Sequence, residues 1–374
     1  MKSDIKTPLI LGIAILAGVI AVSISLSMLD SHPQQTLGNI QDESKTSNAE
    51  QTISKLGYKK APQLVGISGY INTLPEELQK KIHDHVVLYD IWTYSCINCI
   101  RTLPYITAWD EKYSNQGLLI IGIHSPEFEF EKDIENVKTA VTKYGIHYPV
   151  VLDNDKKTWD AFENNYWPRK YIADNEGYIR YDHIGEGGYD ETEKVIQKLL
   201  KERADSMGMD MTVSGELVQV NEFEHSLTMT PELYFGYNFA SGRNQLGNSE
   251  GFIPNQNVTY ALPESLDLHH FYLGGTWTNL EGSMKLVSDS GRIVLPYSGK
   301  EVNIVTGGEA NLKILLDGKL ITSETAGEDV DANGQVHTHY SGLYNIVKTN
   351  KSEQHTLEIV VNNPGFEMFT FTFG

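Results

Sequence analysis

The sequence contains only two cysteines, Cys96 and Cys99, and they are separated by two residues. The apolar run at residues 86–92 predicts a buried strand before this pair, and the pattern at residues 96–113 predicts a helix that begins at it. The pair therefore lies where a strand passes into the first turn of a helix. A helix N-terminus carries a partial positive charge, which favours the thiolate form of a cysteine placed there.

This spacing favours redox chemistry over the other uses of a cysteine pair. Disulfide exchange needs one accessible thiolate and a second thiol that resolves the mixed disulfide. By position, Cys96 is the expected attacking thiol and Cys99, one turn further into the helix, the resolving thiol. A zinc site would need two more ligands, and the chain has no further cysteine, so we expect no metal. A bridge over so short a loop would add little stability. We interpret the pair as a redox-active disulfide that needs no separate cofactor.

Asp90 lies six residues before Cys96 in an otherwise apolar strand. A buried carboxylate there would have a raised pKa and could accept a proton from Cys99. The alternative is an aspartate at a strand end that only makes hydrogen bonds. No charged residue lies between the cysteines, so stabilisation of a thiolate is left to the helix terminus, with Arg101 as the nearby cation.

Pro168 follows Trp167 at the predicted start of a strand, where the missing N–H of a proline is tolerated. The bond before it is a candidate for the cis form, and an ordinary trans turn is the alternative. Two tryptophans flank the predicted site, Trp92 at the end of the first strand and Trp167 before the proline. We expect both to take part in substrate docking.

The N-terminal segment has a different composition. Residues 8–28 carry no charge and are long enough to cross a bilayer as a helix. Lys2 and Lys6 precede them and Asp30 follows, which predicts a cytoplasmic N-terminus and extracytoplasmic domains. A cleaved signal peptide is the alternative, and either would export the chain to a compartment where disulfides persist. Residues 31–60 are polar and predict a flexible stalk.

Two further domains are expected after the anchor (1–30) and the stalk (31–60). Over residues 61–205, predicted strands and helices alternate, which indicates an α/β domain. The expected strands are 86–92, 118–124, 148–152, 169–173 and 178–183, and the expected helices 96–113, 131–144, 156–164 and 191–201. Over residues 211–374, short strands separated by turn residues predict an all-β sandwich or jelly roll, with separate strands expected at 292–296, 301–306, 342–348 and 355–361 among others. The Asp317–Gly318 pair predicts a hairpin turn.

The net charge and the aromatic residues limit the classes of ligand that this chain is expected to bind. A net charge of −19 argues against nucleic acid as a partner. The β-rich segment contains aromatics that suit either its core or a sugar-binding platform, and core is the favoured interpretation: Tyr234, Phe235, Tyr237, Tyr272, Trp277 and Tyr297. The acidic run at residues 127–133 is interpreted as a solvated helix entry.

Several segments resemble one known family. Residues 89–104, YDIWTYSCINCIRTLP, resemble the extracytoplasmic part of DipZ-type thiol–disulfide proteins, which are related to the TlpA and ResA thioredoxins. Residues 167–174, WPRKYIAD, look like the cis-proline loop of that family. Residues 230–237 and 273–277 resemble its carbohydrate-binding-module-like β domain. The resemblance extends over about residues 61–374.

The resemblance implies a thioredoxin-like α/β domain followed by the β domain. It also implies that Cys96 is the nucleophile, Cys99 the resolving thiol, Pro168 a cis-proline and Asp90 the buried acid. The expected function is a membrane-anchored, extracytoplasmic thiol–disulfide oxidoreductase that acts on exported proteins, with the direction of electron flow open. The alternative is an exported glycan- or protein-binding module in which the thioredoxin-like domain is a scaffold.

One departure from the family concerns the electron source. DipZ proteins usually begin with a CcdA-like membrane domain of several helices, and here a single predicted anchor and a stalk stand in its place. We therefore expect a separate CcdA-like membrane protein as electron donor, unless the dithiol is kept oxidised.

Overall fold

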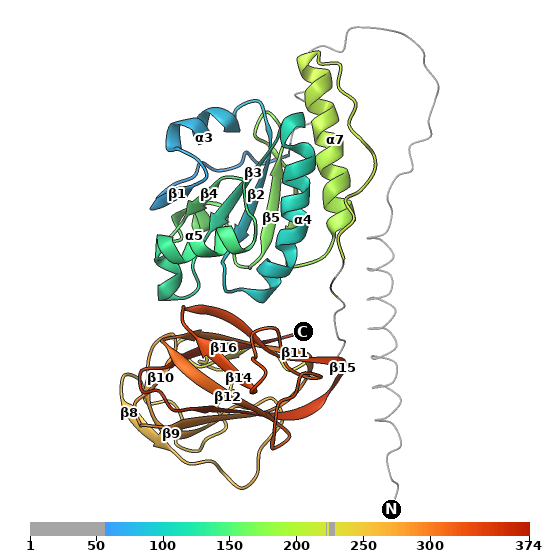
Figure 1. Ribbon diagram of the computed structural model, residues 1–374. Coiled ribbons are helices and arrows are strands. Elements are labelled where there is room, and N and C mark those ends of the chain that lie inside the picture. The colour runs from blue at the N-terminus through green and yellow to red at the C-terminus, as the bar shows by residue number, and fades with distance from the viewer. Residues whose placement is uncertain (1–56, 222, 224–228) are drawn as a thin grey trace, which may run out of the picture. The chain divides into compact units, whose positions relative to one another are not determined.

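The computed structural model describes residues 57–221, 223 and 229–374. These belong to one compact unit, Gly57–Gly374, which contains one sheet of six strands and one of ten (Figure 1). The predicted anchor at residues 8–28 and most of the predicted stalk lie outside the described residues. Within the described part of the chain, no helix is long and apolar enough to cross a membrane.

The first sheet is mixed and has the strand order β1-β4-β3-β2-β5-β6. Its centre is a parallel pair, β2 (Val86–Trp92) and β3 (Leu118–His124), in which every residue is buried. The continuous apolar runs of these strands are typical of parallel strands that are covered on both faces. The remaining strands are β1 (Gly69–Ile71), β4 (Val150–Leu152), β5 (Arg169–Ala173) and β6 (Ile179–Ile184). The strands predicted at 169–173 and 178–183 correspond to β5 and β6, which pair antiparallel as a hairpin.

Helices cover both faces of this sheet. One face packs against α4 (Ile97–Tyr113), α5 (Ile134–Lys143) and α7 (Tyr189–Met207), and Figure 1 shows α4 and α7 side by side along it. The opposite face packs against α3 (Pro75–Ile82) and α6 (Lys157–Ala161). Two short 3₁₀ turns, η1 (Ser114–Gln116) and η2 (Glu129–Lys132), precede β3 and α5. This arrangement places the start of α4 at the carboxyl end of β2.

The second sheet is organised by two long strands. β11 (Gly291–Gly307) and β15 (Gly342–Val361) contain 17 and 20 residues and pair along most of their length. β9 pairs with β8 and β10 and also with β11, so the sheet curls back on itself. The other strands are β7 (Leu233–Tyr234), β8 (Asn257–Tyr260), β9 (Tyr272–Asn279), β10 (Met284–Leu286), β12 (Ala310–Leu316), β13 (Lys319–Leu320), β14 (Gln335–Thr338) and β16 (Glu367–Phe373).

The predicted all-β domain is present, but its strands are joined differently from a sandwich of two separate sheets. All ten strands are hydrogen-bonded into one sheet. The reason is that the runs predicted as separate strands at 292–296 and 301–306 are both parts of β11, which continues through a register shift between Gly299 and Glu301. The runs at 342–348 and 355–361 likewise form the single strand β15. The Asp317–Gly318 hairpin between β12 and β13 is confirmed, with φ of 52° and 73°.

The aromatic residues of the β domain confirm the core interpretation for five of the six positions. Tyr234, Phe235, Tyr272, Trp277 and Tyr297 are all at most 6% exposed, and only Tyr237 is partly exposed. A buried ring offers no face to a sugar. These five residues therefore stabilise the domain and do not form a glycan platform.

Candidate active site

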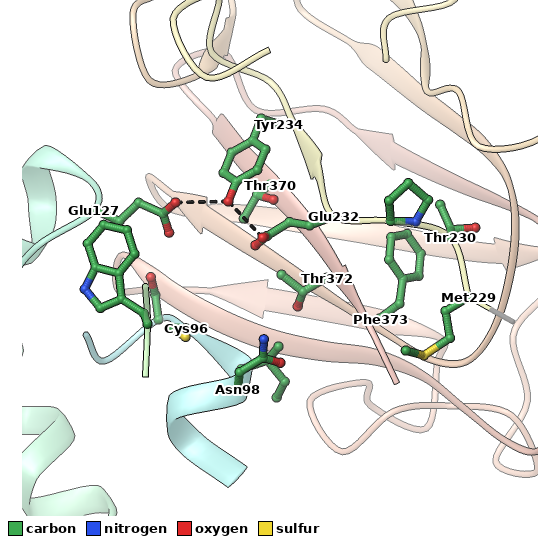
Figure 2. Close-up of a pocket in the computed structure, with 14 residues that line it drawn as sticks. Cys96, Asn98, Glu127, Met229, Thr230, Glu232, Tyr234, Thr370, Thr372 and Phe373 are labelled. Atoms are coloured by element: carbon green, nitrogen blue, oxygen red, sulfur yellow. Dashed lines mark hydrogen bonds between the residues drawn. The ribbon is translucent and has the colours of Figure 1, made fainter. Parts of the chain in front are cut away.

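The two cysteines lie at the junction of β2 and α4, where the sequence places them. Both are free thiols, Cys96 partly exposed and Cys99 buried. Cys96 is the N-cap of α4, and its Sγ accepts the backbone N–H of Cys99 at 3.2 Å. Cys96 also lines a cavity of about 240 Å³, together with Glu127 (Figure 2). Trp167 lines the same cavity. The partly exposed thiol can thus meet a substrate, and the buried thiol lies directly behind it.

The surroundings of Cys96 oppose thiolate formation. Burial raises the pKa of Cys96, the carboxylates of Glu127 and Glu232 raise it further, and the hydrogen bonds from Cys99 lower it. The helix terminus therefore acts against a desolvated, acidic environment. Burial likewise raises the pKa of Cys99 well above its usual value.

Arg101, the cation nearest to the cysteines in the sequence, is paired with two carboxylates. Its guanidinium lies 3.7 Å from a carboxylate oxygen of Glu186 and 3.6 Å from one of Glu301, and it stacks over Phe223 at 3.6 Å. The side chain is buried among these groups, with 8% of its surface exposed. These two carboxylates offset the positive charge that Arg101 can offer to Cys96, and assistance from Arg101 stays a prediction.

Asp90 lies in β2, the strand that leads to the dithiol, and is 1% exposed. Its cross-strand partner on β5 is Lys170, which is also buried and donates from Nζ to the Gly185 carbonyl at 3.2 Å. Burial raises the pKa of Asp90 to about 6, although the Lys170 ammonium lowers it. The Asp90 charge in turn raises the pKa of Cys99, so the two groups interact electrostatically. A carboxyl that titrates near neutrality is suited to accept a proton.

Lys170 was not recognised from the sequence. A lysine in a short strand is ordinarily exposed, and its pairing with Asp90 depends on the register between β2 and β5. The available signal was an acid inside the apolar strand 86–92 and a base, Lys170, inside the predicted strand 169–173.

The tryptophan and proline positions have different outcomes. The Trp167–Pro168 bond is cis, as the family resemblance implies. Trp167 is partly exposed, lines the cavity beside Cys96, and donates from Nε1 to the Ser125 carbonyl at 2.9 Å. Trp92 is 0% exposed. The expectation that Trp92 docks substrate is therefore wrong, since its ring has no free surface.

The acidic run at residues 127–133 is only partly the solvated segment that was expected. Glu129 is exposed, but Glu131 is 0% exposed. Glu131 accepts from the Ser95 hydroxyl at 2.6 Å and from the backbone N–H groups of Glu127 and Phe128 at 2.6 and 2.8 Å. It thereby connects the residue before Cys96 to the loop after β3. The alternation of glutamate with phenylalanine in this run was the signal for burial, because phenylalanines are rare on a solvated face.

The far wall of the cavity comes from the β domain, which contributes Thr230, Glu232, Tyr234 and Thr372 among others. Figure 2 shows the Tyr234 hydroxyl between two carboxylates, 3.0 Å from Glu127 Oε1 and 2.8 Å from Glu232 Oε2. Sequence analysis did not identify Glu127 or Glu232 as site residues, because residues far apart in the chain meet here. Among the described residues, no group of three or more His, Cys, Asp or Glu side chains is arranged to hold a metal ion.

Known proteins resemble both parts of the chain. Residues 72–200 match the Redoxin family and residues 230–374 match the family described as "Thioredoxin like C-terminal domain". Protein DipZ of Mycobacterium tuberculosis is 34% identical over 322 residues, 84% of this chain and 43% of DipZ. The chain thus spans less than half the length of that relative.

A shorter relative is matched over nearly its whole length. The thiol-disulfide oxidoreductase YkuV of Bacillus subtilis is 30% identical over 143 residues, which are 38% of this chain and 94% of YkuV. A solved thioredoxin-like protein in its oxidised form is 28% identical, with a TM-score of 0.35 over 39% of this chain and 97% of that one. With the dithiol at the junction of β2 and α4 and the match to nearly the whole of YkuV, the chain belongs to the thioredoxin-like thiol–disulfide oxidoreductases.

Proposed function

We propose that this protein is a membrane-anchored, extracytoplasmic enzyme that reduces disulfides in exported proteins through Cys96 and Cys99. The observation that carries the proposal is the arrangement of the two thiols. Cys96 is partly exposed in a cavity, and Cys99 is buried one turn further along α4, with its backbone N–H donating to Cys96 Sγ. One thiol can therefore meet the substrate, while the other is kept for the second step.

The reaction follows from this arrangement. The Cys96 thiolate attacks one sulfur of a substrate disulfide, which forms a mixed disulfide and releases the other substrate sulfur as a thiolate. Cys99, deprotonated, then attacks Cys96 and releases the second substrate thiol. The substrate gains two electrons and the enzyme becomes the Cys96–Cys99 disulfide. Asp90 is the proposed acceptor of the Cys99 proton, since burial keeps its pKa at about 6.

The proposed location rests on the sequence before the described residues. The uncharged segment 8–28, preceded by two lysines, supports a single anchor with the catalytic and β domains outside the cytoplasm. We place these domains at residues 61–205 and 211–374. Continuous turnover requires that the Cys96–Cys99 disulfide be reduced again, and a dithiol protein of the membrane, CcdA-like in character, is the proposed donor.

A trapping experiment tests the exchange chemistry. In cells that express Cys99→Ser, mixed disulfides between Cys96 and exported proteins should accumulate, because the resolving thiol is missing. Non-reducing gels followed by mass spectrometry of the adducts would detect them. Cys96→Ser is the matched control and should give none. If neither variant forms adducts under oxidising stress, the scaffold interpretation replaces the enzyme.

Two measurements test direction and location. A Cys96–Cys99 reduction potential near about −270 mV would support a reductant, and one near about −120 mV would make the protein an oxidant. In intact cells, a membrane-impermeant maleimide should label Cys96. Labelling only after lysis would contradict the extracytoplasmic location.

A further inference from the structure

The contact between Tyr234, Glu127 and Glu232 joins the thioredoxin-like part of the chain to the β domain. Glu127 follows β3, whereas Glu232 and Tyr234 lie at the start of the β domain (Figure 2). The Tyr234 oxygen is 3.0 Å from Glu127 and 2.8 Å from Glu232, so both carboxyl groups are within hydrogen-bonding distance of one phenol. Glu127 is half-buried, and Glu232 is exposed as a residue while its carboxyl reaches to Tyr234.

Two hydrogen bonds at the Tyr234 oxygen require two protons, one of which must come from a carboxyl group. A phenol has a single hydrogen and can donate it to only one carboxylate. The second short O···O contact is favourable only if the other carboxyl group carries a proton and donates it to the phenol oxygen. Burial and the two carboxylates raise the pKa of Tyr234, so its own proton stays in place. The three groups therefore fit a chain in which one carboxylic acid donates to Tyr234, which donates to one carboxylate.

Both positive and negative side chains surround the hydrogen-bonded row of Glu127, Tyr234 and Glu232. Glu131 adds a negative charge next to Glu127, and Lys156 offers a positive one. Arg243 lies over the Tyr234 ring at 4.7 Å and faces Glu232. Burial raises the pKa of Glu127 to about 8, with Glu232 and Glu131 as further causes and Lys156 opposing them. Because folded pKa exceeds the ordinary value, Glu127 keeps its proton at neutral pH and loses it as the pH rises.

We propose that Glu127 and Glu232 hold one proton between them through Tyr234, and that loss of this proton suppresses formation of the Cys96 thiolate. Both carboxylates act electrostatically on Cys96, and each raises the pKa of its thiol. With the proton in place, the pair presents one negative charge to Cys96, and without it two. The second charge disfavours a third negative charge on the sulfur. The two glutamates thus make the pKa of Cys96 depend on pH. The inference that this change alters catalysis rests on the proposed function.

The pH profile of Cys96 alkylation tests this proposal in the full chain. A thiol next to constant charges reacts with iodoacetamide at a rate that rises tenfold per pH unit below its pKa. In the wild-type protein, this rise should weaken between about pH 7 and 9, as the shared proton is lost. Glu127→Gln and Glu232→Gln each keep one negative charge throughout. Both should match the wild-type rate at pH 6 and exceed it by roughly 3- to 10-fold near pH 9.

Site assignment and controls keep the outcomes distinct. Mass spectrometry of the Cys96 peptide separates its alkylation from that of Cys99. Glu129→Gln, an exposed glutamate on the same loop, should retain the wild-type profile. A straight wild-type profile, or a bend that persists in both cavity variants, would overturn the proposal.

A measurement on the wild-type protein alone covers the case in which a variant fails to fold. Infrared titration should show a protonated carboxyl band at neutral pH that disappears near pH 8 and is distinct from any band of Asp90 that disappears near pH 6. Absence of the higher-pH band would contradict a shared proton. If the alkylation profile bends but the Cys99→Ser protein traps no substrate, the proposed function fails while the proton-sharing pair stands.

Discussion

At the residue scale, Asp90 gives the protein a predictable pH dependence. Its folded pKa of about 6 lies above the roughly 4 of an unfolded aspartate. Between these two pH values the folded state binds a proton that the unfolded state has lost. The contribution of Asp90 to the free energy of unfolding is therefore fully present at acid pH and is lost as the pH rises through about 6. Asp90→Asn should therefore raise the free energy of unfolding at pH 7.5 by up to about 3 kcal/mol, the free-energy equivalent of a pKa that rises from roughly 4 to about 6, and this value already includes the opposing attraction of Lys170.

Urea unfolding at several pH values checks this expectation, and the gain should shrink toward zero as the pH falls to about 4. A gain that is independent of pH would mean that Asp90 is not the titrating group. The same variant should slow resolution by Cys99, because its proposed proton acceptor is gone.

Asp90 is recognisable from the sequence as an acid in an apolar strand, whereas Lys170, Glu127 and Tyr234 are not. Their roles depend on strand register and on contacts between distant segments.

At the scale of elements, the turn η2 depends on the buried carboxylate of Glu131. This group accepts hydrogen bonds from Ser95 and from two backbone N–H groups of its own loop. Glu131→Gln leaves a single acceptor oxygen and places an amide NH₂ against donors. It should lower the free energy of unfolding by about 2–4 kcal/mol in urea titrations. Glu129→Gln, the exposed neighbour, should change it by less than about 0.5 kcal/mol. Equal effects would show that Glu131 does not organise the loop.

Strands that are marked by a clear apolar pattern in the sequence were predictable. Residues 86–92 and 118–124 form strands with the predicted bounds, because nearly continuous apolar runs mark strands buried on both faces. Residues 169–173 also form a strand with the predicted bounds, although it begins with Arg169 and Lys170. Local sequence patterns did not predict elements whose presence or bounds depend on pairing with another strand or on a capping residue. β1 has only three residues and is stabilised by pairing with β4, which no local pattern reveals. The helix predicted from 131 begins at Ile134, because Asp133 caps it by accepting the Glu135 N–H at 2.9 Å.

At the scale of the whole molecule, an aromatic contact connects the loop that carries Glu127 to the β domain. Phe369 of β16 packs against Phe128 and Phe130 with ring centroids 5.1 and 4.8 Å apart. The cavity beside Cys96 is thus bounded by two domains that this contact holds together. Access to the thiol should then depend on how firmly the domains pack, a property that sequence patterns within either domain do not contain.

Phe369→Ala should loosen this contact and make Cys96 more accessible. The lost ring costs about 3–5 kcal/mol of packing, so the domains should separate more often under native conditions. The expected result is alkylation of Cys96 that is at least several-fold faster at a fixed pH, with circular dichroism unchanged. Phe366→Ala is the matched control, because the Phe366 ring is 0% exposed inside the β domain core and does not belong to the contact between domains. Its loss should lower stability to a similar extent and leave the rate unchanged in the folded protein. If Phe369→Ala reacts no faster than wild type, the packing of Phe369 does not limit access to the thiol.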